Sequence, residues 1–194
     1  MKILLFTDVH ADKESLEKIL EKSKDCDVML CCGDISVFGS GLKRTMQTLR
    51  KSGKKMFLTH GNHEMITELK DLCDGKLDIF LHKEFVKFED VTFIAYGGGG
   101  FSEGDERLDS WIKSLKGKIR GKTIFFTHAP PYGTKLDKLP YLGYRGSKSV
   151  REAIETLEPD LFVSGHFHET FLKKDKIGNT LLINPGPDGT LLEI

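Results

Sequence analysis

Short apolar runs alternate with helix-forming segments along the first third of the chain. The pattern predicts strands at residues 2–7, 27–32 and 55–59 and helices at residues 13–22, 42–50 and 66–73. In the first helix, Leu16, Ile19 and Leu20 recur at helical spacing. The run Ile3–Phe6 has no polar alternation, which is typical of strands covered on both faces. Strands that alternate with helices predict a parallel sheet with right-handed crossovers.

The second part of the chain, from residue 79, is richer in strands, turns and antiparallel hairpins. Its pattern predicts strands at residues 79–81, 85–88, 91–96, 123–127, 161–164, 171–173, 180–184 and 190–193, and helices at 108–115 and 148–157. Ser147 is expected to cap the second of these helices at its N-terminus. Because no low-complexity linker interrupts the pattern, residues 1–194 are predicted to form a single α/β domain.

Charge and targeting signals narrow the class of partner. The chain has 29 basic and 29 acidic residues, so its formal net charge is zero. No global field attracts long nucleic acids or anionic membranes, which are therefore not expected as partners. The opening apolar run is too short for a signal peptide or a membrane span. The cysteines show no metal-ligand spacing, and Cys31 and Cys32 are expected to point to opposite faces of a strand. Reduced thiols and a cytoplasmic location are expected.

Polar side chains follow several of the predicted strands, at the point where each strand ends. They are Asp8 and His10, Asp34, Asn62 and His63, His128, and His166 and His168. Because the carboxyl ends of parallel strands meet at one edge of a sheet, these groups are expected to converge over a single crevice.

All of these groups except His63 are candidate metal ligands: Asp8, His10, Asp34, Asn62, His128, His166 and His168. Oxygen and nitrogen donors without a thiolate suit manganese, iron, cobalt or zinc. The set is too large for one ion, but it fits two ions that share a bridging carboxylate. Such a pair can hold both the attacking and the leaving oxygens of a phosphoryl displacement.

The motifs differ in how specific they are. Asp-x-His and Gly-Asp are common, whereas Gly61–Glu64 (Gly-Asn-His-Glu) and Gly165–His168 (Gly-His-x-His) are rare by chance. Their occurrence together, each at a strand end, favours a functional site over a structural origin. Of the other histidines, His60 is interpreted as the end of a strand, with a place behind the ligands as the alternative, and His82 as a surface residue.

The order of the motifs from Asp8 to His168 resembles the calcineurin-like metallophosphoesterase superfamily. Residues 128–131, 165–169 and 184–186 look most like its compact, Icc-related phosphodiesterase-type branch. The resemblance implies a four-layer α-β-β-α sandwich of two mixed sheets with helices outside. It also implies how the ligands divide: Asp8, His10, Asp34 and His168 would hold one metal, and Asn62, His128 and His166 would hold the second, with Asp34 as the bridge.

The resemblance further implies hydrolysis of a phosphate ester by a metal-bound hydroxide, with His63 as the catalytic group near the leaving oxygen. Two divalent ions are expected, manganese first, with iron, zinc, cobalt and nickel as alternatives. A phosphodiesterase is the preferred hypothesis. A phosphomonoesterase on the same site and a metal-bearing scaffold that binds a protein are the alternatives, and the intact His63 argues against the scaffold. The expected partner is a small phosphate ester, with nucleotides among the candidates, and the oligomeric state is left open.

Two segments depart from the Ser/Thr protein phosphatases of the superfamily, which carry an arginine after the Gly-Asp and Gly-Asn-His-Glu motifs. Residues 35–38 and 65–67 contain no arginine, so protein phosphatase activity is not expected. Substrate contacts are predicted from Arg145 and from Ser147, where a helix N-terminus offers N–H groups to a phosphate. An ordinary solvated loop with a capping serine is the alternative. The run Gly97–Gly100 is interpreted either as a flexible lip of the site or as a turn that needs positive φ.

Overall fold

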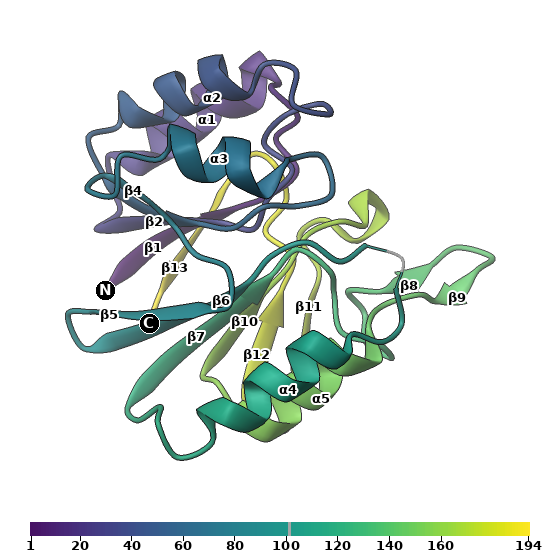
Figure 1. Ribbon diagram of the computed structural model, residues 1–194. Coiled ribbons are helices and arrows are strands. Elements are labelled where there is room, and N and C mark those ends of the chain that lie inside the picture. Colours follow the sequence, from purple (N-terminus) through teal and green to yellow (C-terminus); the bar gives the residue numbers. More distant parts are fainter. Residues whose placement is uncertain (101) are drawn as a thin grey trace.

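Two β-sheets form the centre of the molecule in the computed structural model, which describes residues 1–100 and 102–194 (Figure 1). The first sheet has the order β13-β1-β2-β3-β4. Its strands are β1 (Lys2–Phe6), β2 (Val28–Cys31), β3 (Lys55–Leu58), β4 (Asp78–Phe80) and β13 (Thr190–Glu193). Strands β1 to β4 are parallel, and β13 pairs antiparallel with β1. The predicted parallel sheet is therefore confirmed for the first third of the chain.

The second sheet has the order β11-β12-β10-β7-β6-β5. Its strands are β5 (Glu84–Phe88), β6 (Val91–Tyr96), β7 (Lys122–Thr127), β10 (Leu161–Val163), β11 (Lys174–Ile177) and β12 (Thr180–Ile183). The inner strands are parallel to one another, and only the edge strands β5 and β11 pair antiparallel. The expected antiparallel hairpins thus lie at the two edges of this sheet.

Helices cover the outer face of each sheet. They are α1 (Lys13–Ser23), α2 (Leu42–Arg50) and α3 (Ile66–Leu72) on the first sheet, and α4 (Glu106–Leu115) and α5 (Lys148–Leu157) on the second (Figure 1). Between the sheets lies a core that joins Leu5 and Leu30 to Phe93 and Phe126. The molecule is therefore the expected four-layer α-β-β-α sandwich.

Alternation along the strands explains how each sheet serves two layers. Leu5 and Cys32 face the core between the sheets, whereas Leu4 and Cys31 face the helices. The opposite directions expected for the two adjacent cysteines are confirmed, and both thiols are free and buried. Among the described residues, no helix is both long and apolar enough to cross a bilayer.

Side-chain caps set the start of three helices. Asp12 accepts a hydrogen bond from the backbone N–H of Ser15, and Asp105 caps α4 in the same way. Ser147 accepts from the N–H of Val150 at 3.2 Å, so its predicted capping role is confirmed.

The strand predicted at residues 171–173 is wrong. A short 3-10 helix, η1 (His168–Thr170), precedes this segment, and Leu172 adopts a positive φ of 64°, which breaks an extended conformation. The strand begins later, at Lys174, where mostly charged residues form an edge strand without an apolar run. The predicted loop after residue 129 also contains a small hairpin, β8 (Lys138–Leu139) and β9 (Gly143–Tyr144), which projects from the body of the molecule (Figure 1).

Candidate metal centre

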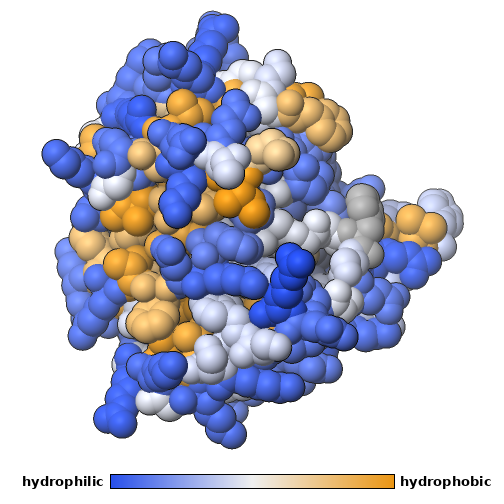
Figure 2. Space-filling view, viewed as in Figure 1, coloured by the Kyte–Doolittle hydropathy of each residue, from blue (hydrophilic) through white to orange (hydrophobic). Residues whose placement is uncertain are grey.

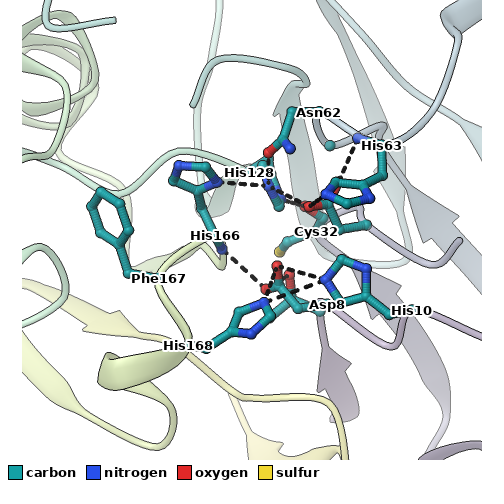
Figure 3. A network of polar contacts seen from close by, with 12 residues as sticks. Asp8, His10, Cys32, Asn62, His63, His128, His166, Phe167 and His168 are labelled. Atoms are coloured by element: carbon teal, nitrogen blue, oxygen red, sulfur yellow. Dashed lines mark hydrogen bonds and ion pairs between the residues drawn. The ribbon is translucent and has the colours of Figure 1, made fainter. Parts of the chain in front are cut away.

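The structure brings the predicted ligands of both sheets together at one edge of the sandwich (Figure 3). The loops after β1, β2 and β3 carry the groups of the first sheet, and those after β7 and β10 carry the groups of the second. In chain order these ligands are Asp8, His10, Asp34, Asn62, His128, His166 and His168. The convergence expected from the strand ends therefore extends across the gap between two sheets.

Asp8 lies at the centre of one group of ligands. Its Oδ1 is 3.5 Å from Nε2 of His168 and 3.9 Å from Nε2 of His10, and these two nitrogens are 3.3 Å apart. The other oxygen, Oδ2, accepts from the Thr7 hydroxyl at 2.8 Å and from the backbone N–H of His166 at 3.0 Å. Asp8 Oδ1 is buried and accepts no hydrogen bond from the described residues. An anionic oxygen that faces two imidazole nitrogens in this way suits a divalent cation.

Asp34 and His128 form the centre of a second group. His128 Nε2 lies 3.2 Å from Asp34 Oδ2, 3.0 Å from Asn62 Oδ1 and 3.3 Å from His166 Nδ1. Asp34 Oδ1 is held by the backbone N–H of His63 at 2.9 Å. Oxygen and nitrogen atoms thus converge on one point from several strand ends.

Backbone carbonyls orient two of the imidazoles. Nδ1 of His10 lies 3.0 Å from the carbonyl oxygen of Ser36, and Nδ1 of His128 lies 3.0 Å from that of Cys32. Since a carbonyl only accepts, each Nδ1 carries the proton and donates it. The Nε2 atoms of both rings therefore face the centre, which is the orientation that metal-binding histidines require.

Asp34 connects the two groups. It belongs to the compact set with His128 and His166, and also to a set with His10 and His63, while His10 belongs to the set with Asp8 and His168. This overlap places one carboxylate between two clusters, as a bridging ligand would be.

The charges of the centre are strongly coupled. Burial alone would raise the pKa of Asp34, but the imidazole of His128 outweighs it and lowers that pKa to about 2. Burial would likewise lower the pKa of His128, yet Asp34 raises it to about 9. For His166, burial and the neighbouring His128 lower the pKa to about 4. Without a metal the protein therefore favours carboxylate anions, a protonated His128 and a neutral His166, and a metal that binds His128 must displace the proton from its Nε2.

His63 lies beside these ligands with a different set of contacts. Its Nδ1 accepts the backbone N–H of Phe38 at 3.3 Å, and its Nε2 is 3.9 Å from Asp34 Oδ2. Because Nδ1 is an acceptor, the proton of the neutral imidazole is on Nε2, directed to the centre. His63 also belongs to one compact ligand set, so its expected role as a catalytic group, and not a ligand, stays a prediction.

The two residues predicted to bind substrate form hydrogen bonds with other parts of the chain. Arg145 follows the β8–β9 hairpin, is exposed, and donates from Nη1 to the Tyr144 carbonyl. Ser147 is buried, and its N–H donates to the Pro130 carbonyl at 2.8 Å. The next N–H, of Lys148, donates to the Glu103 carbonyl at 2.7 Å, so part of the chain already occupies this helix end. Within the described ranges neither residue contacts a predicted ligand, and both substrate roles stay predictions.

Glu64 is the residue of the site that sequence reasoning left without a role. It is buried, and its carboxylate accepts from the backbone N–H groups of Asp34 at 2.9 Å, Gly61 at 3.0 Å and Ser36 at 3.0 Å. It also accepts from the Ser36 hydroxyl at 2.7 Å. One carboxylate thus joins the loops after β2 and β3. The position of Glu64 in the rare Gly61–Glu64 motif was the feature of the sequence that could have indicated a role in the site.

Three glycines allow the loops to approach one another closely. A Cβ on Gly61 would lie 2.0 Å from Asp34 Oδ1, and one on Gly165 would lie 2.2 Å from Asp8 Oδ2. A Cβ on Gly33, whose φ is +95°, would lie 2.3 Å from the backbone nitrogen of Gly61. Any larger residue at these glycines would therefore collide with the carboxylates of Asp34 or Asp8 or with the neighbouring backbone.

The glycine run and the remaining histidines lie behind this edge. Gly98, Gly99 and Gly100 have positive φ, and a Cβ on Gly100 would lie 3.6 Å from Cε1 of His166, so the run is a turn beside the centre. His82 is half-buried and its Nδ1 accepts from the N–H of Gly97, so the interpretation of His82 as a surface residue is wrong. Its side chain is withdrawn against the ring of His60, 4.8 Å away, because this turn covers both.

Comparison with known proteins matches this arrangement to a family. Residues 1–170 match the family described as calcineurin-like phosphoesterase. The chain belongs to this family. The match includes every ligand position of the centre, so the metallophosphoesterase resemblance of the motifs is confirmed.

A relative and several solved structures are similar to the chain over most of its length. An uncharacterised protein of Methanocaldococcus jannaschii is 33% identical to this phosphoesterase-family chain over 199 residues, covering 96% of this chain and 88% of that protein. A crystal structure of a Thermus thermophilus protein is similar in fold, with a TM-score of 0.77, 19% identity and coverage of 96% and 90%. A structure described as a dimetal phosphatase, from Danio rerio, has a TM-score of 0.61, 13% identity and coverage of 94% and 86%. These structures share the fold of the present chain.

Proposed function

We propose that this calcineurin-like phosphoesterase is a hydrolase that uses two divalent ions and prefers phosphodiesters. The observation that carries the proposal is the pair of ligand groups joined by the single carboxylate of Asp34. The fold similarity to a protein described as a dimetal phosphatase supports a two-metal site. A small phosphate ester is the proposed substrate class.

The residues fit such a pair of ions. Asp8, His10 and His168 with Asp34 would hold one ion, and Asn62, His128 and His166 with Asp34 would hold the other. The buried Asp8 Oδ1 without a hydrogen bond and the two imidazole nitrogens 3.3 Å apart are the observations that support this fit. Hard and borderline donors favour manganese, with iron, zinc, cobalt and nickel as alternatives. When bound, the ions would supply Lewis-acid activation of water and neutralise phosphoryl charge.

The protein's own residues would hold the ligand carboxylates in place and stabilise the leaving oxygen. Asp8 and Asp34 are anchored by backbone N–H groups, so their free oxygens keep a fixed direction. His63 directs its Nε2–H to the centre, and we propose that this group donates a hydrogen bond to the leaving oxygen and stabilises the negative charge that develops there. The Phe38 N–H keeps the His63 ring in that orientation.

The charge near His63 supports the preference for diesters. A monoester carries an additional negative charge that phosphatases hold with a cationic side chain, commonly arginine. Residues 35–38 and 65–67, which follow the two motifs next to the centre, contain no lysine or arginine. A diester has one anionic charge fewer and needs no such partner. The proposed preference for a diester therefore has a physical basis in these two segments.

The test is a paired hydrolysis assay on protein stripped of metal and refilled with Mn²⁺. Bis-p-nitrophenyl phosphate and p-nitrophenyl phosphate share a leaving group and differ in charge. We expect faster turnover of the diester, and a return to background for both substrates after chelation. Faster cleavage of the monoester would contradict the diester preference. Absence of turnover on both, with two ions bound per chain, would contradict hydrolysis of simple phosphate esters and favour either a narrow substrate or the scaffold alternative.

A further inference from the structure

A tight turn after β2 carries an exposed aromatic ring next to the centre. Val37 and Ser40 exchange backbone hydrogen bonds at 3.1 and 2.9 Å, and Phe38 and Gly39 between them have φ of 48° and 80°. Positive φ at both central positions is the signature of a type I′ turn, which favours asparagine, aspartate or glycine at the first of them. A phenylalanine is costly there, so the needs of the turn do not explain why this residue is present.

Hydrogen bonds hold the turn against residues of the candidate site. The N–H of Gly39 donates to the Ser36 hydroxyl at 3.2 Å, and that hydroxyl donates to Glu64 at 2.7 Å. The N–H of Phe38 donates to Nδ1 of His63. The position of the Phe38 ring is therefore set by the same carboxylate that joins the loops of the metal centre.

The ring of Phe38 packs on His63 and leaves its other face open. The two ring centroids are 4.0 Å apart with an interplanar angle of 26°, yet Phe38 is 78% exposed. Burial of apolar surface is the usual reason for a phenylalanine in a fold, and this ring buries little of its own. An exposed ring at this place offers a flat stacking surface to a ligand.

Apolar neighbours extend this surface. Val37, Met65 and Ile66 are also exposed, and they belong to the same two segments that follow the motifs of the centre. Figure 2 shows apolar surface at the upper right of the molecule, over the turn ahead of α2 and the beginning of α3. An exposed apolar patch rimmed by polar residues commonly marks a binding site. Here its position beside His63 places it on the side of the leaving group.

We infer that Phe38 is a specificity-determining residue that stacks on an aromatic ring carried by the leaving alcohol of the substrate. The inference rests on the proposed function, because it uses His63 to define the side of the leaving group. The ring of the substrate would lie on the open face of Phe38, one layer beyond His63. A nucleobase separated from its phosphate by a ribose, or an aryl ester, would supply the same chemistry.

Ligand pairs that differ only in the aromatic ring test the inference. Mn²⁺-loaded protein is titrated by calorimetry with adenosine 5′-monophosphate and ribose 5-phosphate, and separately with phenyl phosphate and methyl phosphate. Turnover, if it occurs, registers separately as a sustained heat signal. We expect the aromatic member of at least one pair to bind about tenfold more tightly, in line with aromatic stacking on a base.

Variants at the same position assign this preference to the ring. Phe38→Ala keeps the backbone N–H to His63 but removes the ring, so the ratio of affinities within the pair should fall toward one. Phe38→Tyr should retain the ratio, and so should Phe85→Ala, which removes a half-exposed ring from the edge strand β5. The pair that responds identifies the ring as a nucleobase or an aryl group, and either result supports the inference.

Two results would overturn it: equal affinities within both pairs for the unaltered protein, or a ratio that persists in Phe38→Ala. Failure of the proposed function would look different. In that case no phosphate ester would be turned over with two ions bound, whatever the affinity ratios.

Discussion

At the scale of single residues, His63 differs from its neighbours because a backbone N–H occupies one of its ring nitrogens. The other nitrogen then directs an N–H to the negative charge that develops on a departing alkoxide. The contribution of such a hydrogen-bond donor depends on the leaving group, since an alkoxide is an unstable anion and a nitrophenolate is a stable one.

The first prediction follows from that dependence. His63→Ala should lower kcat by about 10²–10⁴-fold on an ester with an alkyl leaving group, and by much less on bis-p-nitrophenyl phosphate. Steady-state rates on the two substrates check this, with metal content measured on the same samples. An equal loss on both substrates would contradict a role at the leaving oxygen, and loss of bound metal would show that His63 acts as a ligand.

The second prediction concerns the space around Asp8. Gly165→Ala places a Cβ 2.0 Å from the Thr7 hydroxyl and 2.2 Å from Asp8 Oδ2, so the carboxylate must move. We expect weaker Mn²⁺ binding, measured by calorimetric titration, in a protein that still unfolds cooperatively. Gly104→Ala is the control, because a Cβ there meets nothing within 4 Å and its affinity should be unchanged. Unchanged affinity in Gly165→Ala would refute the steric argument.

At the scale of elements, the residue that caps α4 at its N-terminus also forms hydrogen bonds with β6 and α5. Asp105 accepts from the N–H groups of Arg107 at 2.9 Å and Leu108 at 3.2 Å, and from the Tyr96 hydroxyl at 2.6 Å. Its own N–H donates to the Ser149 hydroxyl at 2.8 Å, which links α4 to α5. Burial would raise the pKa of Asp105, but Tyr96 and the helix N–H groups outweigh it, so this pKa lies below its usual value.

The third prediction is a pH-dependent loss of stability. Asp105→Ala should lower the free energy of unfolding by about 1–2 kcal/mol at pH 7, because it removes a helix cap. A lowered pKa in the folded state stabilises the protein above the unfolded value, about 3.9, and this stabilisation is lost as the pH falls through the folded value. The difference between the two proteins should therefore shrink as the pH falls below about 4.

Urea unfolding at pH 7 and at several values down to pH 3 measures that difference. Ser110→Ala, an exposed position on the same helix, serves as the control and should be close to neutral at every pH. A difference for Asp105→Ala that stays constant with pH would contradict the assignment to an ionised cap.

The elements also show what the sequence could and could not predict. Buried strands such as Val91–Tyr96 were predictable because continuous apolar runs are required under two layers. The edge strand Lys174–Ile177 was not, because an edge strand with one solvated side can consist largely of charged residues. Position at the edge of a sheet is a property of the tertiary fold, and no local pattern encodes it.

The same contrast holds within the candidate site. The convergence of the candidate ligands was predictable because strand ends and rare motifs mark these residues. The hydrogen bonds of Glu64 could not be predicted, because its partners are mostly backbone N–H groups. One of these partners, Asp34, is thirty residues away along the chain. Ser147 shows the reverse case, in which a free helix end was expected and the carbonyl of Glu103 covers it.

At the scale of the whole molecule, the candidate centre joins two sheets that otherwise meet through an apolar core. Asp8 and Asp34 extend from the first sheet, and His128 and His166 from the second. Ions held by both sets would connect the layers at one edge. Metal binding should therefore stabilise the entire sandwich and not only the local loops.

The fourth prediction is a large effect of metal on thermal unfolding. Mn²⁺ at about a hundred times its Kd should stabilise the fold by about 2.7 kcal/mol per site. For a chain of this size the unfolding midpoint should rise by about 5–10 °C for each ion bound, and chelation should reverse the rise. Asp34→Asn, which removes the shared carboxylate, should lose most of the shift in the same calorimetric scan. A full shift in that variant would place the ions elsewhere.

The two adjacent thiols at the end of β2 provide a way to follow how this molecule opens. Cys32 faces the core between the sheets and Cys31 faces the helices, and burial raises the pKa of both thiols well above the usual value. Neither can react with an alkylating reagent until its own layer separates, because the reactive thiolate does not form in the closed structure. Neighbouring positions thus report on two different interfaces. In a protein whose Cys26 and Cys73 are replaced by alanine, Cys31→Ala and Cys32→Ala variants would each leave one thiol and would time the separation of each interface.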